Sequence, residues 1–194
     1  MGKSRYISLV GIDGAGKTTQ IRNVSRELRK RGHQVSSHQQ FKTDLGLKCR
    51  EVLSTTFDPY LRAFLFALDH YAARERILGL LEKNDFVISD RSFYCSVAYL
   101  SPRGISETWV LSLYRYLPKP DTVILLDIPI EVAAERKPLD ELVPVKNMDF
   151  LGQVREYYLE LAGKGFLIRV DGNMPEEEVT HTILQLLTKR ELRK

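Results

Sequence analysis

Residues 6–18 read YISLVGIDGAGKT, and this stretch decides the fold. Its last eight residues fit G-x-x-x-x-G-K-[ST], the pattern of a phosphate-binding loop. An apolar segment, Tyr6–Val10, comes before the loop. After it, apolar residues recur at helical spacing (Ile21, Val24 and Leu28) until Gly32. A strand, a glycine-rich loop and a helix in this order predict an α/β nucleotide-binding fold.

The residue types of the loop suit a polyphosphate ligand. Glycines let backbone N–H groups turn toward phosphate oxygens without a side chain in the way. We expect Lys17 to reach the β- and γ-phosphates of ATP and the Thr18 hydroxyl to bind Mg²⁺. The predicted ATP site comprises Gly11, Ile12, Asp13, Gly14, Ala15, Gly16, Lys17, Thr18 and Thr19.

Other apolar runs predict the rest of a sheet. The expected strands are Tyr6–Val10, Gln34–His38, Phe86–Ser89, Thr122–Leu126 and Phe166–Val170. Three of them are nearly continuous in apolar residues, which is typical of strands buried on both faces. Helical patterns alternate with these strands, and one expected helix, Tyr60–Leu81, is apolar on more than one face. The pattern predicts an α/β doubly wound fold in which helices flank both faces of a five-stranded parallel sheet, as a single domain over residues 1–194.

Composition narrows the function classes. The chain has 194 residues, of which 43% are hydrophobic and 28% charged, the balance of a globular protein. No apolar run approaches the roughly 20 residues of a membrane helix, and the N-terminus does not read as a signal peptide. Cys49 and Cys95 are too few for a disulfide framework, so we expect thiols and a cytoplasmic protein. A net charge of +4 suits phosphate ligands but is too small to predict nucleic-acid binding.

A phosphate loop fits a GTPase switch, a motor-type ATPase or a small-molecule kinase. A GTPase would carry a base-reading N-K-x-D, and residues 146–149, KNMD, have the wrong order. A motor would need accessory elements for which the chain has little room.

Asp90 and Arg91 follow the strand 86–89, where ligands of parallel sheets bind. Asp90 can hold Mg²⁺ or orient an acceptor oxygen, and Arg91 can fork onto a phosphate. Asp127 also ends a strand, where a structural role is favoured over a catalytic one.

Together these motifs resemble the thymidylate kinase family. The loop 11–19 is similar to the family's phosphate loop, and Leu65-Phe66-Ala67 is similar to a stretch of a long helix. Residues 90–99, DRSFYCSVAY, resemble the signature D-R-x-x-x-x-S-x-A-Y. The family's fourth strand is similar to residues 120–129, and its C-terminal portion is similar to residues 150–162 and 170–171. The resemblance implies a P-loop kinase fold and transfer of the γ-phosphoryl group of Mg–ATP to dTMP, giving dTDP, in a homodimer.

The resemblance also implies residue roles. Asp13 would hold the 3′-hydroxyl of dTMP, Phe66 would pack on the base, and Arg91 would hold the acceptor phosphate. Lys42 stands where the family has an arginine on that phosphate. The full acceptor set is Asp13, Lys42, Phe66, His70, Arg91, Ser96 and Tyr99. The expected catalytic residues are Lys17, Asp90, Arg91 and Arg136, and Thr18 and Asp90 are the expected metal ligands. A lid is expected over about 136–148, with Arg136, Lys137 and Lys146 as its basic residues.

Two positions depart from the family pattern. His70 replaces an arginine that faces the base, and Leu100 replaces a glutamine. Leucine donates no hydrogen bond and histidine offers fewer donors than arginine, so we expect relaxed base specificity with dUMP accepted alongside dTMP. The alternatives are a broader deoxynucleoside monophosphate or deoxynucleoside kinase, and a non-catalytic nucleotide-binding regulator.

Overall fold

A parallel sheet forms the centre of the molecule. The computed structural model describes residues 4–136 and 148–189. Five strands lie in the order β2-β3-β1-β4-β5, and all neighbouring pairs are parallel. Their bounds are β1 Arg5–Val10, β2 Val35–Gln39, β3 Phe86–Asp90, β4 Thr122–Asp127 and β5 Ile168–Asp171. The predicted five-stranded parallel sheet is confirmed.

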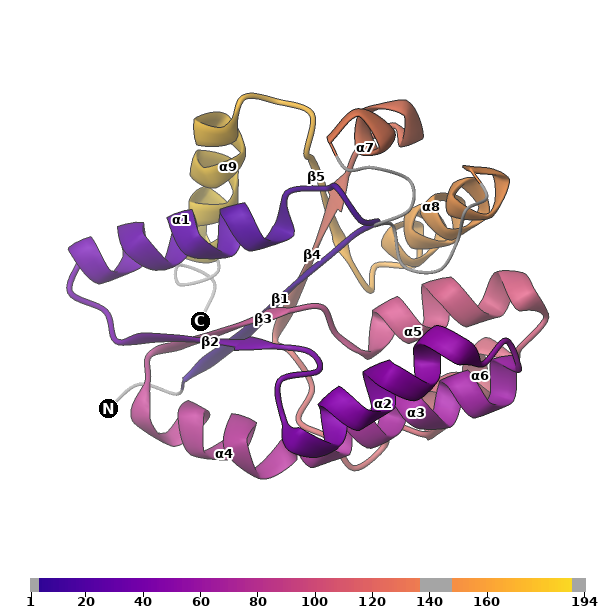
Figure 1. Cartoon of the computed structure of the whole chain (residues 1–194). Coiled ribbons are helices and arrows are strands. Elements are labelled where there is room, and N and C mark those ends of the chain that lie inside the picture. The colour runs from indigo at the N-terminus through magenta and orange to yellow at the C-terminus, as the bar shows by residue number, and fades with distance from the viewer. Residues whose placement is uncertain (1–3, 137–147, 190–194) are drawn as a thin grey trace.

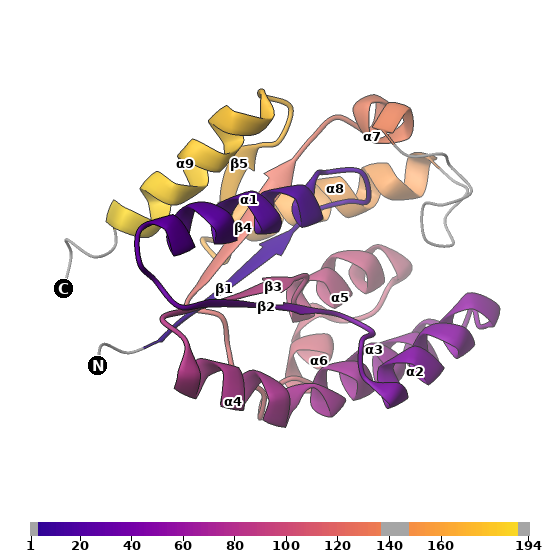
Figure 2. The ribbon, with the colours of Figure 1, turned by 60° about the vertical axis from the view of Figure 1, so that its left-hand side comes forward.

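Helices cover both faces of the sheet, as predicted. Their bounds are α1 Lys17–Lys30, α2 Asp44–Thr55, α3 Pro59–Ala72, α4 Arg74–Lys83, α5 Phe93–Leu100, α6 Glu107–Ser112, α7 Ile130–Arg136, α8 Met148–Gly163 and α9 Glu176–Lys189, with a 3₁₀ turn, η1, at Ser101–Arg103. Helices α1 and α9 pack together on one face, and α4, α5 and α8 lie on the other (Figures 1 and 2). None of the described helices combines the length and apolar character that crossing a membrane requires.

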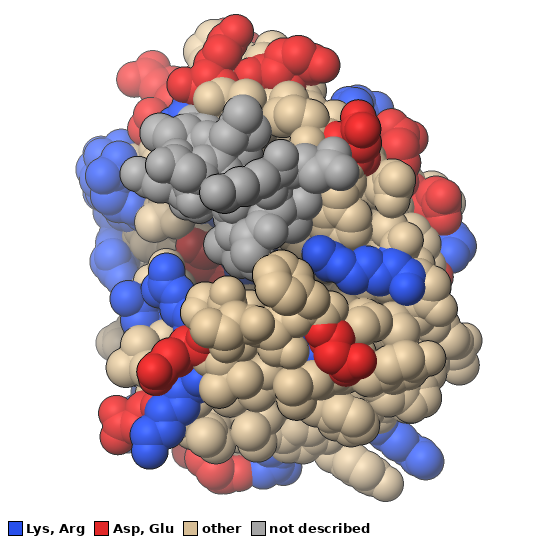
Figure 3. Space-filling view, turned by 45° about the vertical axis from the view of Figure 1, so that its right-hand side comes forward, with Lys and Arg blue, Asp and Glu red and all other residues tan. Residues whose placement is uncertain are grey.

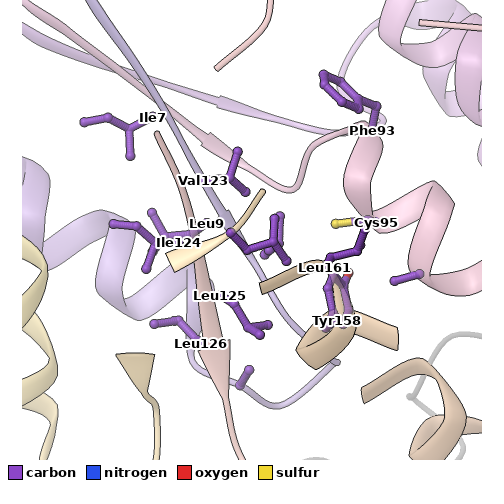
Figure 4. Packing of buried hydrophobic residues seen from close by; sticks show 14 of the residues in the cluster. Ile7, Leu9, Phe93, Cys95, Val123, Ile124, Leu125, Leu126, Tyr158 and Leu161 are labelled. Atoms are coloured by element: carbon purple, nitrogen blue, oxygen red, sulfur yellow. The ribbon is translucent and has the colours of Figure 1, made fainter. Parts of the chain in front are cut away.

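The main core lies between the sheet and both helix layers. Ile7, Leu9 and Ile124 are fully buried in the central strands. Figure 4 shows Cys95 of α5 beside Tyr158 of α8, next to the side chains of these strands. Cys49 and Cys95 are both buried free thiols, as expected.

The prediction of one continuous helix over Tyr60–Leu81 was wrong. It is divided into α3 and α4 at Ala73, which is 1% exposed. Ala73 packs in a second, smaller core cluster with Tyr6, Ile77 and Val87. This cluster places α4 against the N-terminal parts of β1 and β3.

The phosphate loop lies where the strand order reverses, at the carboxyl ends of β1, β3 and β4. Leu9 is paired with Asp90, and this register brings the end of β3 beside the loop. Gly11 has φ 143°, and a Cβ there would lie 2.5 Å from the Leu126 carbonyl oxygen. The close contact with β4 therefore requires glycine and fixes where the loop begins.

Candidate active site

Left-handed glycines shape the phosphate loop. Gly14 and Gly16 have φ 84° and 85°. A Cβ at Gly14 would lie 2.9 Å from the Ala133 carbonyl oxygen of α7, whereas one at Gly16 would meet nothing. Gly16 precedes α1 without a capping side chain, so the first N–H groups of that helix have no side-chain acceptor there. Such a helix end attracts anions.

Lys17 lies folded over the loop. Its Nζ donates to the carbonyl oxygens of Gly11 at 3.1 Å and Ile12 at 2.8 Å. Burial, with a contribution from the Arg91 charge, lowers the pKa of Lys17 to about 8. The ammonium is therefore held by two neutral acceptors that a phosphate can replace, and an anion beside it would favour its charged form.

The two residues expected to bind metal lie together. The Thr18 hydroxyl donates to Asp90 Oδ2 at 2.8 Å, so a hydroxyl from α1 and a carboxylate from β3 meet at one edge of the loop. No cluster of three His, Cys, Asp or Glu side chains exists among the described residues. Hard oxygen ligands from one or two side chains, completed by phosphates and water, are what Mg²⁺ takes in phosphoryl-transfer sites. The residues present therefore fit this ion.

The acceptor side is built around Arg91. Its guanidinium forms a hydrogen-bonded ion pair with Asp13, which is 6% exposed. Arg91 also adopts φ 78°, an unusual conformation for a residue with a Cβ, and its N–H donates to the Leu9 carbonyl at 3.0 Å. The strained turn aims the side chain over the phosphate loop, and such strain is found mainly at functional sites.

One cleft of about 850 Å³ joins both sides. The predicted site residues that line it are Asp13, Gly14, Gly16, Lys17, Thr18, Thr19, Phe66, Asp90, Arg91, Ser96, Tyr99 and Arg136. Gly11, Ile12 and Ala15 belong to the loop but are not among the lining residues. The structure thus brings donor and acceptor residues, expected from separate parts of the sequence, into one cavity.

Three of these lining residues differ in their hydrogen bonding. Ser96 accepts a hydrogen bond from the Tyr114 hydroxyl at 2.7 Å. The Tyr99 hydroxyl is buried with no hydrogen-bond partner among the described residues, and burial raises the pKa of Tyr99. Arg136, the last residue of α7, donates to the Gly172 carbonyl at 3.2 Å. Residues 137–147 of the expected lid lie outside the described residues.

Other predicted residues are not brought into the cleft. Lys42 is exposed and is not a lining residue. His70 lies behind the wall, where its Nδ1 is 3.1 Å from the Phe66 carbonyl oxygen and 3.4 Å from Gln40 Nε2. Burial, together with the nearby His38, lowers the pKa of His70 to about 4, so its ring is neutral. Leu100 is fully buried in the core.

Several lining residues were missed by the sequence reasoning, namely Gln39, Gln40, Phe41, Arg50, Leu53, Ser54, Arg62 and Cys95. Phe41 has φ 58°, held by a hydrogen bond of 3.1 Å from its N–H to the buried Asp69 carboxylate. No sequence pattern gives a left-handed phenylalanine. Arg62 had a readable signal, since it interrupts an apolar helical stretch one turn before Phe66.

Asp127 has the structural role that was favoured for it. Its carboxylate accepts from Arg155 Nε at 2.7 Å and from Arg169 Nε at 2.9 Å, and its side chain is 3% exposed. One buried carboxylate thus links the end of β4 to α8 and β5. Asp127 is absent from the residues that line the cleft.

Comparison with known proteins agrees with this geometry. The model of the thymidylate kinase family matches residues 9–183. A probable thymidylate kinase of Methanocaldococcus jannaschii is 37% identical over 183 residues, covering 93% of this chain and 94% of the relative. A probable thymidylate kinase 1 of Saccharolobus solfataricus is 33% identical over 187 residues, covering 95% and 97%. With the phosphate loop, the Asp90-Arg91 strand end and the shared cleft in place, the chain belongs to the thymidylate kinase family.

Proposed function

We propose that this protein transfers the γ-phosphoryl group of Mg–ATP to dTMP, giving dTDP. The observation that carries the proposal is the single cleft that Lys17 lines on the donor side and Arg91 on the acceptor side. Family membership supports the same reaction and does not favour a broader kinase or a non-catalytic regulator.

The donor end would be bound by backbone and charge. The N–H groups of the loop and the start of α1 would receive the phosphate oxygens, and the Lys17 ammonium would exchange its two carbonyl acceptors for them. Thr18 and Asp90 would hold Mg²⁺, which when bound neutralises charge on the phosphate oxygens.

Transfer needs alignment and positive charge. A new bond forms between the γ-phosphorus and an oxygen of the acceptor phosphate, while its bond to the β-phosphate bridging oxygen breaks. Arg91 would hold the acceptor phosphate in line, and Lys17 and Arg136 would stabilise the charge shared by the oxygens. Asp90 would also orient the acceptor.

The base would lie along the wall opposite the phosphate loop, and the sugar would lie near Asp13 of the loop. We assign the 3′-hydroxyl to Asp13 and the base to the face of Phe66, with Ser96 and Tyr99 as further acceptor contacts. Lys42 and His70 do not line the cleft, so their contacts with the acceptor stay predictions. We further propose a single catalytic domain over residues 1–194, a lid over about 136–148 and a cytoplasmic setting, consistent with the free thiols.

A coupled assay tests the function. With Mg–ATP, we expect dTMP to be phosphorylated and thymidine to be left unchanged, and chelation of Mg²⁺ by EDTA to abolish turnover. Phosphorylation of nucleosides in preference to monophosphates would contradict the assignment. Nucleotide binding without turnover on any acceptor would instead show a regulator.

We propose that α3 pairs with a second copy in a twofold dimer. Tyr60 and Phe64, each 54% exposed, contact the Trp109 ring of α6 with centroids 5.4 and 5.7 Å apart. Leu61, Leu68 and Tyr71 of the same helix are also exposed. Figure 3 shows wide surface areas without charged side chains. Several exposed apolar side chains on one helix are typical of a self-association face.

Light scattering at micromolar concentration is expected to give about twice the monomer mass of 22.3 kDa. Phe64→Lys places a charge in the centre of the face and is expected to give monomers. The matched control is Tyr116→Lys, at an exposed aromatic residue outside α3 that is expected to leave the mass unchanged. A parent protein of monomer mass would contradict the dimer.

A further inference from the structure

Arg62 is a buried cation that lines the cleft. It is 5% exposed, and its Nη1 donates to the carbonyl oxygens of Leu53 at 2.8 Å and Thr56 at 2.9 Å, at the C-terminal end of α2. Within the described part of the chain, its Nε is buried with no hydrogen-bond partner, and no carboxylate forms an ion pair with it. A buried N–H donor without an acceptor is uncommon in folded proteins and calls for an explanation.

The surroundings of Arg62 suit a flat ring. Its guanidinium carbon lies 5.9 Å from the centroid of the Phe66 ring, and the Phe41 and Phe66 rings are 6.1 Å apart. All three side chains line the same cleft. Aromatic rings offer a packing surface to any base, whereas a guanidinium offers only hydrogen-bond donors.

We propose that Arg62 is a specificity-determining residue that donates a hydrogen bond to the 4-oxo group of the acceptor base. The inference rests on the proposed function, because it takes the base to lie on Phe66. The 4-oxo group of thymine or uracil accepts such a bond. The 4-amino group of cytosine is itself a donor, so it would leave two donors facing each other. Arg62 therefore selects for dTMP and dUMP against dCMP.

Neither of the two positions that depart from the family pattern can do this. His70 is bound to the Phe66 carbonyl behind the wall, and Leu100 is in the core. Arg91, whose side chain is 23% exposed, is ion-paired with Asp13 and is assigned to the acceptor phosphate. The relaxed base specificity expected from His70 and Leu100 then applies to the 5-methyl group alone. Arg62 makes no contact that distinguishes dTMP from dUMP, so both should be accepted.

The test compares kcat/KM for dTMP, dUMP and dCMP in the parent and in Arg62→Lys. Lysine keeps a donor for the carbonyls of α2 but lacks the planar fork. We expect the ratio of dTMP to dCMP to fall by about 10-fold or more, as loss of one discriminating hydrogen bond implies, while the KM for ATP stays unchanged. Arg29→Lys is the matched control, because Arg29 donates to the Val35 carbonyl at 2.7 Å and does not line the cleft.

A second variant keeps the inference testable if Arg62→Lys does not fold. Arg62→Gln carries both a donor and an acceptor, and it is expected to move the ratio further toward dCMP. Calorimetric binding of dTMP and dCMP gives the same comparison without turnover. Equal losses on all three monophosphates would overturn the inference, because they would show that Arg62 only supports α2 or holds the common phosphate. A parent protein inactive on every acceptor would reject the proposed function instead.

Discussion

Lys17→Met is expected to lower kcat by at least about 100-fold. The variant keeps the length of the side chain but removes the ammonium that would stabilise the transferring group. Loss of such a charge in a water-poor cleft raises the barrier by about 3 kcal/mol or more. Steady-state rates with saturating ATP and dTMP measure the effect, and turnover within a few-fold of the parent would show that the loop is not the donor site.

The pH profile supplies a second readout for Lys17. Burial lowers the pKa of Lys17 to about 8, so the free protein loses this charge as the pH rises through that value. For the parent, kcat/KM for ATP should therefore fall above about pH 8, and for Lys17→Met that step should be missing. The control is Lys30→Met in the same helix, where Lys30 forms only a surface pair with Glu27 at 3.0 Å. Its rate and profile are expected to match the parent.

Arg91→Met is expected to lower kcat/KM for dTMP by about 100-fold or more and to leave the KM for ATP within a few-fold. A forked arginine makes charge-assisted hydrogen bonds to phosphate, and each contributes about 1.5–3 kcal/mol. Arg91→Lys should recover only part of the loss, because lysine supplies charge without the fork. Kinetics with each substrate varied in turn separate the two effects.

Arg91→Met also leaves the buried Asp13 carboxylate without its cation. A thermal melt therefore accompanies the kinetics, and the double variant Arg91→Met with Asp13→Asn removes the stranded charge. The double variant is expected to regain stability but not activity toward dTMP. If it regained activity as well, Arg91 would act by neutralising Asp13 and not by holding the acceptor phosphate.

The sheet could be predicted because its signals are local. Continuous apolar runs gave β1, β3 and β4 to within one residue at each end. The strand predicted over Gln34–His38 was also within one residue of β2 at each end. Only β5 was less well placed: it begins at Ile168 and not at Phe166, which is 44% exposed after the left-handed Gly165. The division at Ala73 could not be read, because no glycine or proline marks it and sequence spacing does not show that Ala73 packs with Tyr6 and Val87.

The site, too, has a part that could be predicted from local sequence and a part that could not. The loop and the strand end at Asp90 are motifs with local backbone reasons, and they are found together in the cleft. The opposite wall depends on where α2 and α3 lie, which sequence spacing does not encode. We predicted Lys42 and His70 from their positions in the family pattern, but neither lines the cavity. The lining residues near them that the pattern did not predict include Phe41, Arg50 and Arg62.

The links of Asp127 to Arg155 and Arg169 join segments that are far apart in the sequence. The chain leaves the sheet at Asp127, and Arg155 returns to the same carboxylate 28 residues later. Arg169, 42 residues after Asp127, donates to it as well. One side chain therefore serves as a common anchor for β4, α8 and β5, and its loss would break the side-chain links between all three elements at once.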